Sequence, residues 1–372
     1  MKTTRIISCL FLWLLAQTVS MNTSAQSTKK PVRVGVVGLV HSHVGWILNR
    51  ARQTGDPNIE VVGIAEPNRE VAERYLKEFG LPQRLLYSTV EEMLDKTRPD
   101  AVTAFNEISN HLNVVKVCAP RGVHVMVEKP LAVSIAQAKE MEALAKKHNI
   151  QLLTNYETTW YGSNHKAHRM AVQEGAIGPI RRIVVHDGHD GPAQMNKEFV
   201  AWLTDPVTNG AGALFDFGCY GANLATWLLK GEKPRTVSAF TLQIKPDVYP
   251  KVDDDATIIL EYPKTQVVIQ ASWNWPFSRK DMEVYGETGY VFTLDGTRMR
   301  IRLKGDKAEQ TTEAAKTDAP VGDPFDYLAQ VVRGETKSVD DLSSLKVNMI
   351  VMEILDAARR SAQSGGKPIA IN

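Results

Sequence analysis

Cysteine is scarce in this chain, and the shortage excludes one class of protein. Only three of the 372 residues are cysteines, and Cys9 lies in an apolar N-terminal stretch. The other two, Cys118 and Cys219, each stand in an apolar helical context and are expected to be buried thiols rather than a bridge. A small domain held together by disulfides is therefore excluded.

An excess of either charge is also missing. The 44 Lys and Arg residues nearly balance the 42 Asp and Glu residues, which gives a formal net charge of +2. No basic run stands out, so neither nucleic acid nor an anionic membrane is expected as a partner. The rest of the composition, with 43% hydrophobic and 23% charged residues, is typical of a globular protein of two domains or one large one.

Residues 1–25 have the pattern of a Sec-type signal peptide. Two basic residues precede the apolar run 6–16, and small residues at 23–25 offer a cleavage site. The apolar run is too short to span a bilayer stably, although an uncleaved anchor stays open as an alternative. A twin-arginine motif is absent from this stretch. We expect cleavage near Gln26 and a periplasmic or otherwise exported protein that has no membrane contact afterwards.

From Val32 onward the chain alternates between short apolar runs and helical segments. Such alternation predicts βαβ units with right-handed crossovers and a parallel sheet. We therefore expect an α/β, Rossmann-type domain over residues 31–153. The expected strands are 32–38, 59–66, 100–106 and 123–128, and the expected helices are 44–52, 69–79, 111–119 and 134–148.

After about Asn155 the pattern changes to strands joined by Gly, Pro, Asp and Lys clusters, as hairpins require. Residues 154–372 are expected to form a second, α+β domain on a largely antiparallel sheet. The polar segment 306–319 is expected to be a mobile loop. The expected strands are 180–186, 236–244, 256–262, 267–273, 282–285, 291–294 and 299–303, and the expected helices are 213–229 and 341–364.

The run Val127–Glu128–Lys129–Pro130 ends a predicted buried strand on two opposite charges. The carboxyl end of such a strand lies where open α/β folds bind ligands. Pro130 restricts Lys129 to extended geometry and is compatible with a cis bond. A lysine desolvated in that crevice is expected to have a lowered pKa suited to proton transfer. A surface ion pair at a strand end is the alternative.

The first strand leads into a turn that matches a dinucleotide fingerprint only in part. Gly38 fills the first position of GxGxxG, but Val40 and His43 occupy the other two. A Cβ at these positions hinders close approach to a pyrophosphate, so this motif alone is a weak signal. Glu66 ends the second strand, where a carboxylate holds ribose hydroxyls and favours NAD over NADP; Arg69 nearby keeps NADP as a less favoured alternative.

Taken together, these residues resemble the Gfo/Idh/MocA family, named for glucose–fructose oxidoreductase, inositol dehydrogenase and MocA. The resemblance covers nearly the whole chain after the signal peptide. The Glu-Lys-Pro and Asp-x-Gly segments are specific as a pair, whereas either one alone is not. The matching segments are 34–38, Glu66, 111–132, 174–180, 210–220, 285–289 and 361–367.

The resemblance implies a nicotinamide cofactor, sugar or polyol substrates, and a homo-oligomer formed through an open C-terminal sheet. It places Lys129 at the reacting hydroxyl or carbonyl, with Asp216 as a second polar group and Tyr220 as a proton donor or acceptor. Many family members have His where this chain has Tyr220. Independently of the family, Asp216, Tyr220 and Asn223 stand at i, i+4 and i+7, which predicts one helical face.

Contacts to the cofactor and substrate are expected around these groups. Two clusters, 186–190 and 41–43, are rich in His, and they leave substrate contact, a plain turn and zinc open as alternatives. Their spacing matches no closed zinc motif, so we expect no metal. Cofactor contacts are expected from Gly38, Leu39, Val40, His41, Glu66, Asn106, His111, Glu128 and Asn155, and substrate contacts from Lys129, Trp160, His189 and Asn223.

The expected function is that of an NAD-dependent oxidoreductase moving hydride to or from a ring carbon of a sugar or glycoside. One alternative is a glycosidase or lyase that oxidises its substrate transiently, and another is a non-catalytic sugar-binding relative. A Sec substrate crosses the membrane unfolded, so its cofactor must be captured outside the cytoplasm. We therefore expect NAD to be held tightly and recycled within the site.

Overall fold

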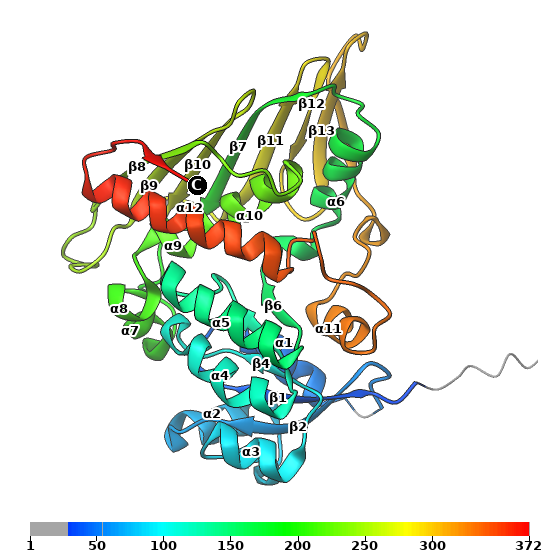
Figure 1. Ribbon diagram of the computed structural model, residues 1–372, viewed down its shortest axis with the longest axis vertical. Helices are drawn as coiled ribbons and strands as arrows, with labels where there is room; N and C mark the ends of the chain where they lie inside the picture. Colours follow the sequence, from blue (N-terminus) through cyan, green and yellow to red (C-terminus); the bar gives the residue numbers. More distant parts are fainter. Residues whose placement is uncertain (1–28, 54, 372) are drawn as a thin grey trace, which may run out of the picture.

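Two sheets, one above the other in Figure 1, organise the molecule. The computed structural model describes residues 29–53 and 55–371, so the predicted signal peptide lies outside the described residues. The N-terminal sheet lies below, the C-terminal sheet lies above, and α12 (Leu345–Gln363) runs across the region where the two halves meet.

The N-terminal sheet has six parallel strands in the order β3-β2-β1-β4-β5-β6, which confirms the Rossmann-type prediction. The strands are β1 (Val32–Val37), β2 (Ile59–Ala65), β3 (Leu86–Tyr87), β4 (Ala101–Ala104), β5 (His124–Glu128) and β6 (Leu152–Asn155). The helices between them are α1 (Val44–Ala51), α2 (Arg69–Phe79), α3 (Val90–Thr97), α4 (His111–Cys118) and α5 (Ile135–His148). The sequence did not predict β3, α3 or β6.

Local signals explain where several of these helices begin. Asn68, Thr89 and Ser134 each accept a hydrogen bond from a backbone N–H of the first turn of α2, α3 and α5, respectively. Gly80 ends α2 in the left-handed conformation at φ 62°. These caps fix where each helix begins. Because the strands are parallel, the carboxyl ends of β1, β2, β4 and β5 meet at one edge of the sheet.

The C-terminal sheet has nine strands in the order β14-β13-β12-β11-β7-β10-β9-β8-β15. All neighbouring pairs are antiparallel except β7 and β10, which confirms the prediction of a largely antiparallel sheet. The strands are β7 (Ile180–Gly188), β8 (Thr236–Leu242), β9 (Asp255–Glu261), β10 (Gln266–Ser272), β11 (Arg279–Gly286), β12 (Gly289–Thr293), β13 (Arg298–Leu303), β14 (Gln310–Glu313) and β15 (Ile369–Ala370).

Three sequence-based expectations for this half are corrected. The segment 306–319 is not simply a loop, because β14 pairs with β13 within it and a short 3-10 turn follows at Lys316–Asp318. The expected helix 213–229 is interrupted at Phe217 into α9 (Ala213–Asp216) and α10 (Gly218–Leu228). The closing helix begins at Leu345 rather than at 341, because Ser344 caps it by accepting from the Val347 N–H.

Shorter helices that the sequence did not reveal connect the two halves. They are α6 (Gly162–His168), α7 (Lys197–Leu203), α8 (Pro206–Asn209) and α11 (Pro324–Val332). The last of these returns to the N-terminal half, where Phe325 and Leu328 join the hydrophobic core formed by β1, β2 and α1. Arg50 on α1 reinforces this contact through ion pairs with Asp323 and Asp326. The division of the chain at residue 153 stays a prediction.

Two further observations bear on the sequence analysis. Cys118 and Cys219 are free and buried, as predicted. Within residues 29–53 and 55–371, no helix combines the length and apolar character needed to cross a membrane.

Candidate functional site

A buried ion pair joins the two halves of the molecule. Lys129 follows the last residue of β5, and the Lys129–Pro130 peptide bond is cis. Its ammonium group donates to the Oδ1 atom of Asp216 at the end of α9, and to the carbonyl oxygen of the same residue at 3.0 Å. Lys129 is 5% exposed and Asp216 is 3% exposed. The Glu-Lys-Pro and Asp-x-Gly segments therefore meet at one point.

This contact corrects the expected protonation state of the lysine. Burial disfavours the charged form of Lys129, but the carboxylate of Asp216 outweighs burial and raises the pKa above its ordinary value. Burial likewise opposes the charge of Asp216, yet Lys129 lowers its pKa. The expectation of a lowered lysine pKa is therefore wrong, and Lys129 is an ammonium group at neutral pH.

Aromatic rings and one histidine surround the pair. Trp273 donates from Nε1 to Asp216 Oδ2 at 2.9 Å, which fixes the carboxylate on the side away from Lys129. The Lys129 ammonium lies 5.2 Å from the centre of the Tyr220 ring and 5.7 Å from that of Phe217. His189 packs edge-on against Phe217. Lys129, Asp216, Tyr220 and His189, all predicted from sequence, thus lie in one group.

The state of His189 follows from its surroundings. Burial lowers its pKa, so the ring is neutral at pH 7. Its Nδ1 atom accepts the backbone N–H of Gly191 at 2.8 Å, which leaves the ring hydrogen on Nε2. Burial also raises the pKa of Tyr220 well above its usual value, so the phenol keeps its hydrogen. At neutral pH Lys129, Tyr220 and His189 all have hydrogens to donate.

A second charged cluster on the same side was missed by sequence reasoning. Lys280 on β11 pairs with Glu157, which also accepts from the Tyr161 hydroxyl at 2.6 Å. The Lys280 ammonium lies 5.0 Å from the centre of the Tyr220 ring, so two ammonium groups approach this ring. These residues lack a motif, because Lys280 comes from β11 whereas Glu157 and Tyr161 come from the turn after β6.

Asp187 is the most unusual member of this cluster. Asp187 lies opposite Lys280 in the backbone register of β7 and β11. Its side chain is fully buried, and neither carboxylate oxygen has a hydrogen-bond partner among the described residues. Burial raises its pKa well above the usual value and so favours the neutral form of Asp187. The neighbouring His186 instead pairs with Asp281 on the same two strands, at 2.9 Å between Nδ1 and Oδ2.

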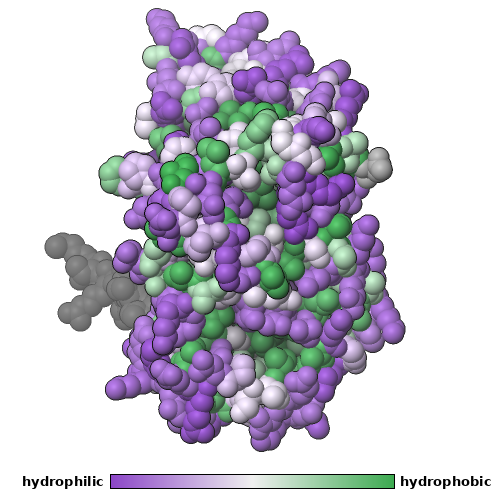
Figure 2. Space-filling model, turned by 90° about the vertical axis from the view of Figure 1, so that its left-hand side faces the viewer, coloured by the Kyte–Doolittle hydropathy of each residue, from purple (hydrophilic) through white to green (hydrophobic). Residues whose placement is uncertain are grey.

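A cavity of about 380 Å³ opens at the edge of the N-terminal sheet, where a dinucleotide is expected. It is lined by residues at the ends of β1, β2 and β4, among them Gly38, Val40, Glu66 and Asn106. Figure 2 shows a mostly hydrophilic face, with hydrophobic residues gathered in a recess of its lower, N-terminal half. The Oδ1 atom of Asn106 is buried without a partner among the described residues, so a ligand donor fits there.

The loop after β1 is braced by the protein itself. Gly38 has φ +77°, and a Cβ there would come within 2.7 Å of Asn106. The N–H groups of Val40 and His41 both donate to the carbonyl of Phe105. The Leu39 N–H donates to Glu66 Oε2 at 2.9 Å, while Glu66 Oε1 accepts from the Asn68 N–H. These loop N–H groups therefore already have partners, which explains why Val40 is tolerated where the fingerprint has glycine.

His111 has a structural partner that the sequence did not indicate. It is fully buried, and its Nδ1 atom lies 3.1 Å from the carbonyl oxygen of Leu131, just after the cis bond. Burial lowers its pKa to about 4, so the ring is neutral. His111 supports the Glu-Lys-Pro turn, while its expected contact with cofactor stays a prediction.

A chain of hydrogen bonds runs from Glu128 toward the surface. Glu128 Oε1 accepts from Asn155 Nδ2 at 2.8 Å, and Asn155 Oδ1 accepts from Trp160 Nε1 at 3.0 Å. Glu128 Oε2 lies 3.0 Å from His43 Nδ1. Burial opposes the charge of Glu128, but His43 and His41 outweigh it and lower the pKa to about 2. This chain connects the predicted cofactor residues Glu128 and Asn155 with the predicted substrate residue Trp160.

Asn223 does not belong to the site group. It is fully buried on α10, and its Nδ2 donates to the carbonyl oxygen of Leu342 at 2.8 Å. The expectation that Asp216, Tyr220 and Asn223 share one face of a single helix is wrong, because the break at Phe217 places Asp216 on a separate helix. The expected contact of Asn223 with substrate stays a prediction.

The α7–α8 segment (residues 197–209) lies beside the N-terminal half (Figure 1). It contacts the loop that follows β1, residues 38–43, which we call the phosphate loop. Phe199 and Trp202 pack against the His41 ring, and Trp202 Nε1 donates to the Val40 carbonyl at 3.5 Å. Glu198 receives two hydrogen bonds from Arg74 on α2, at 3.1 and 3.0 Å. The α7–α8 segment therefore covers the loop at which a cofactor would lie.

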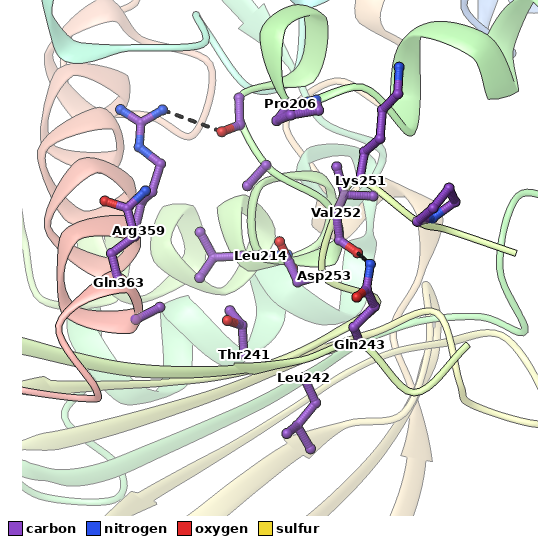
Figure 3. Close-up of a pocket in the computed structure, with 14 residues that line it drawn as sticks. Pro206, Leu214, Thr241, Leu242, Gln243, Lys251, Val252, Asp253, Arg359 and Gln363 are labelled. Carbon is purple, nitrogen blue, oxygen red and sulfur yellow. Dashed lines mark hydrogen bonds between the residues drawn. The ribbon is translucent and has the colours of Figure 1, made fainter. Parts of the chain in front are cut away.

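Another cavity, of about 430 Å³, lies between α12 and the loop after β8 (Figure 3). Arg359 lines it and donates to the carbonyl of Gly210, and Gln243 on the opposite wall donates to the carbonyl of Val252. None of Lys129, Asp216 or His189 lines this cavity. The chemistry described above is therefore concentrated at the strand ends and not here.

Two family models match consecutive parts of the chain. The oxidoreductase family, NAD-binding Rossmann fold, matches residues 32–156, and the GFO/IDH/MocA C-terminal domain matches residues 165–292. The chain belongs to the Gfo/Idh/MocA family of oxidoreductases. Its N-terminal domain is thus an NAD-binding Rossmann domain.

Characterised relatives of this oxidoreductase match part of it. A trans-1,2-dihydrobenzene-1,2-diol dehydrogenase from Xenopus laevis is 29% identical over 217 residues, covering 57% of this chain and 61% of the relative. A 1,5-anhydro-D-fructose reductase from Ensifer adhaerens is 28% identical over 209 residues, covering 55% and 59%. The match thus spans about three fifths of the length of these relatives.

Solved structures match the oxidoreductase over nearly its whole length. An aldose–aldose oxidoreductase from Caulobacter crescentus, complexed with glycerol, has a TM-score of 0.76 at 21% identity and covers 92% of this chain and 100% of that one. An inositol dehydrogenase homolog from Azotobacter vinelandii, complexed with NAD+, has a TM-score of 0.79 at 17% identity, covering 93% and 98%. At such identities the likeness shows a shared fold.

Proposed function

We propose that this oxidoreductase transfers hydride between NAD and a ring carbon of a sugar or glycoside. The observation that carries the proposal is the buried Lys129–Asp216 pair, which stands beside the Tyr220 ring and His189 at the end of β5. Sugar-related activities of relatives support the substrate class: 1,5-anhydro-D-fructose for one, and levoglucosan for a dehydrogenase solved with NADH.

The protonation states suggest how the residues share the work. Bound NAD accepts or supplies the hydride. Lys129, Tyr220 and His189 donate hydrogen bonds toward the substrate oxygen and stabilise the negative charge that develops there. When a carbonyl is reduced, the Lys129 ammonium gives its proton to the oxygen. When a hydroxyl is oxidised, Lys129 must first be neutral, and it then takes the hydroxyl proton while Asp216 stabilises the returning charge.

A second candidate function is bond cleavage through transient oxidation. It is favoured by the extra acid–base groups Lys280, Glu157 and Asp187, which hydride transfer alone does not require. Oxidation of a ring carbon acidifies the neighbouring C–H, a base removes that proton, and the leaving group departs. Re-reduction then restores the cofactor, so this route gives no net NADH.

We further propose that the protein is exported, retains its NAD and forms a homo-oligomer. Retention is supported by the α7–α8 segment, which packs on the phosphate loop through Phe199 and Trp202. Oligomer formation through the C-terminal sheet is supported by Phe240 and Leu242, which are 56% and 60% exposed on β8. N-terminal sequencing of the protein from the periplasm, and light scattering, test export and assembly.

One experiment separates the two catalytic candidates. Protein loaded with NAD is mixed with a panel of sugars and nitrophenyl glycosides, and NADH absorbance and released nitrophenol are followed together. Hydride transfer predicts reduced cofactor without nitrophenol. Nitrophenol release without lasting NADH supports transient oxidation. If neither signal appears with any sugar while NAD is bound, the carbohydrate proposal is wrong.

A further inference from the structure

Lys245, in the β8–β9 loop (residues 243–254), joins two other loops that each carry a residue of the candidate site. Its ammonium group donates to the carbonyl oxygen of Asp190 at 2.9 Å and to that of Trp273 at 2.7 Å. These acceptors lie 55 and 28 positions away along the chain. Hydrogen bonds from a charged donor are about twice as strong as neutral ones, so Lys245 fixes the two main chains relative to each other.

The contact with Trp273 leads to the ion pair of the site. Trp273 is fully buried, and its indole Nε1–H donates to Asp216 Oδ2 at 2.9 Å, while Oδ1 accepts from Lys129. An indole has a single donor, so the bond to Asp216 depends on the direction in which the ring leaves the main chain. Lys245 holds that main chain at the Trp273 carbonyl, and only one residue separates it from Asp216.

The contact with Asp190 leads to the histidine of the site. His189 precedes Asp190, and its Nδ1 atom accepts the Gly191 N–H at 2.8 Å, which orients the ring. Gly191 has φ +105°, and a Cβ there would lie 3.3 Å from the Lys245 ammonium, so this turn packs directly against the lysine. A shift of the main chain at Asp190 would therefore rotate the imidazole.

The main chain of Lys245 is itself held in place. Asp254 is fully buried, and its Oδ2 atom accepts the Lys245 N–H at 2.7 Å. Gln243 closes the loop by donating to the carbonyls of Tyr249 at 2.6 Å and Val252 at 3.2 Å, the second of which is visible in Figure 3. The ammonium group therefore projects from a fixed base.

Tyr249 supports the same tryptophan from a second direction. The Tyr249 and Trp273 ring centres lie 5.0 Å apart in an edge-on arrangement, and the Lys245 ammonium lies 5.3 Å from the Tyr249 ring centre. The Tyr249 hydroxyl accepts the Ala193 N–H at 3.3 Å, from the segment that follows His189. The β8–β9 loop thus contacts the main chain of Trp273 through Lys245 and its ring through Tyr249.

A lysine that only stabilises the surface is the alternative, and the same loop provides an example. Lys251 is 65% exposed at its side chain and pairs with Asp205 at 3.0 Å, away from the site residues. Lys245 is half-buried, and its two acceptors belong to the loops that carry His189 and Trp273. The contacts of Lys245 therefore differ from those of an ordinary surface lysine.

We propose that Lys245 is a positioning residue for hydride transfer, because it directs the Trp273 indole at Asp216 and the His189 ring at the substrate oxygen. Its effect on turnover rests on the proposed function, whereas the Trp273–Asp216 bond exists without substrate. Groups that stabilise developing charge must be aligned most closely in the transition state. Loss of Lys245 should therefore lower kcat and leave KM nearly unchanged.

The kinetic test compares Lys245→Met with Lys251→Met, which removes the exposed lysine of the same loop. Methionine keeps a long apolar side chain but has no N–H to donate. Lys245→Met should lower kcat about tenfold or more, since a misplacement of 1 Å can cost about 100-fold. KM for the sugar and the affinity for NAD should stay within about twofold. Lys251→Met should keep kcat within about twofold, because an exposed ion pair contributes little. Equal kcat values in the two variants would overturn the inference.

NMR separates positioning from a general loss of stability. In 15N-tryptophan-labelled protein without substrate, the Trp273 indole signal is identified by its absence in Trp273→Phe. We expect this signal to move upfield in Lys245→Met, as a weakened hydrogen bond requires, and to stay in place in Lys251→Met. An unmoved signal in Lys245→Met would overturn the inference even if kcat falls.

A double variant shows whether Lys245 works through Trp273. In the Trp273→Phe background, Lys245→Met should reduce kcat by a smaller factor than in the wild type, because the two changes remove the same interaction. Losses that multiply in full would contradict the proposed route. If the wild type converts no sugar, the proposed function fails, while the indole signal still decides whether Lys245 orients Trp273.

Discussion

The ammonium group of Lys129 contacts Asp216 twice, once at the carboxylate and once at the main-chain carbonyl. The carbonyl contact matters because it depends on where α9 ends and not on the side chain. The break between α9 and α10 at Phe217 exposes that carbonyl to Lys129, so the interruption of the helix is part of the site. Replacing the carboxylate alone would leave the lysine in place but remove its charge partner.

Replacement of Lys129 should abolish most activity without loss of cofactor. We expect Lys129→Met to lower turnover at least 100-fold, because it removes both the proton donor and the positive charge at the substrate oxygen. NAD content after gel filtration should be unchanged. The control is Lys139→Met, an exposed position on α5 that should retain full turnover. Near-normal rates in the Lys129 variant would contradict the assigned role.

Oxidation and reduction should differ in how their rates depend on pH. The pKa of Lys129 is raised above its ordinary value of 10.5, so the neutral amine needed for oxidation is rare at pH 7 and grows about tenfold with each pH unit. Single-turnover oxidation of a sugar by bound NAD should therefore rise from pH 6 to 9. Reduction, which uses the ammonium form, should stay level over that range. Oxidation that is independent of pH would show that another group accepts the proton.

The Arg74–Glu198 pair should slow the release of NAD. Exchange of either partner for the opposite charge, Arg74→Glu or Glu198→Arg, loosens the α7–α8 segment. Because Arg74 is 41% exposed at its side chain, the pair is worth at most about 1 kcal/mol, or roughly a two- to fivefold change in rate. Release is measured by dilution into excess thio-NAD. The double exchange should restore slow release, and failure of that rescue would leave the contact without a role in retention.

Gly212 should be intolerant of any side chain. A Cβ there would come within 1.8 Å of the Asp253 carbonyl oxygen, and the Gly212 N–H donates to the Asp253 carboxylate. We expect Gly212→Ala to lower the free energy of unfolding by about 1–3 kcal/mol and to misplace Asp216 four residues later. Urea unfolding and turnover are measured together. Gly322→Ala, at an exposed position with no atom within 4 Å, is the matched control and should change neither.

The sequence predicts most of the architecture, and its failures have physical causes. Parallel strands are continuous apolar runs, so β1, β2, β4 and β5 were readily recognised. The strand β3 has only two residues, and α7, α8 and α11 are short helices stabilised by contacts distant in sequence. Local sequence patterns do not reveal contacts between residues that are far apart in the chain.

Among the site residues, those that belong to sequence motifs were predicted and those that do not were missed. Lys129, Asp216 and Tyr220 belong to motifs, and the structure brings them together as expected. Lys280 on β11 and Glu157, in the turn that follows β6, lie 123 positions apart and meet only in the folded chain. The pKa of Lys129 was misjudged because its burial could be inferred from the strand, whereas its partner on α9 could not.

The return of α11 to the N-terminal core has a consequence for biosynthesis. Phe325 and Leu328 fill space beside β1 and α1, yet they are translated long after β6 completes the first sheet. A nascent chain that has only reached β6 therefore lacks part of the wall that covers this core. The core of the N-terminal half is therefore complete only once the last fifth of the polypeptide has been synthesised.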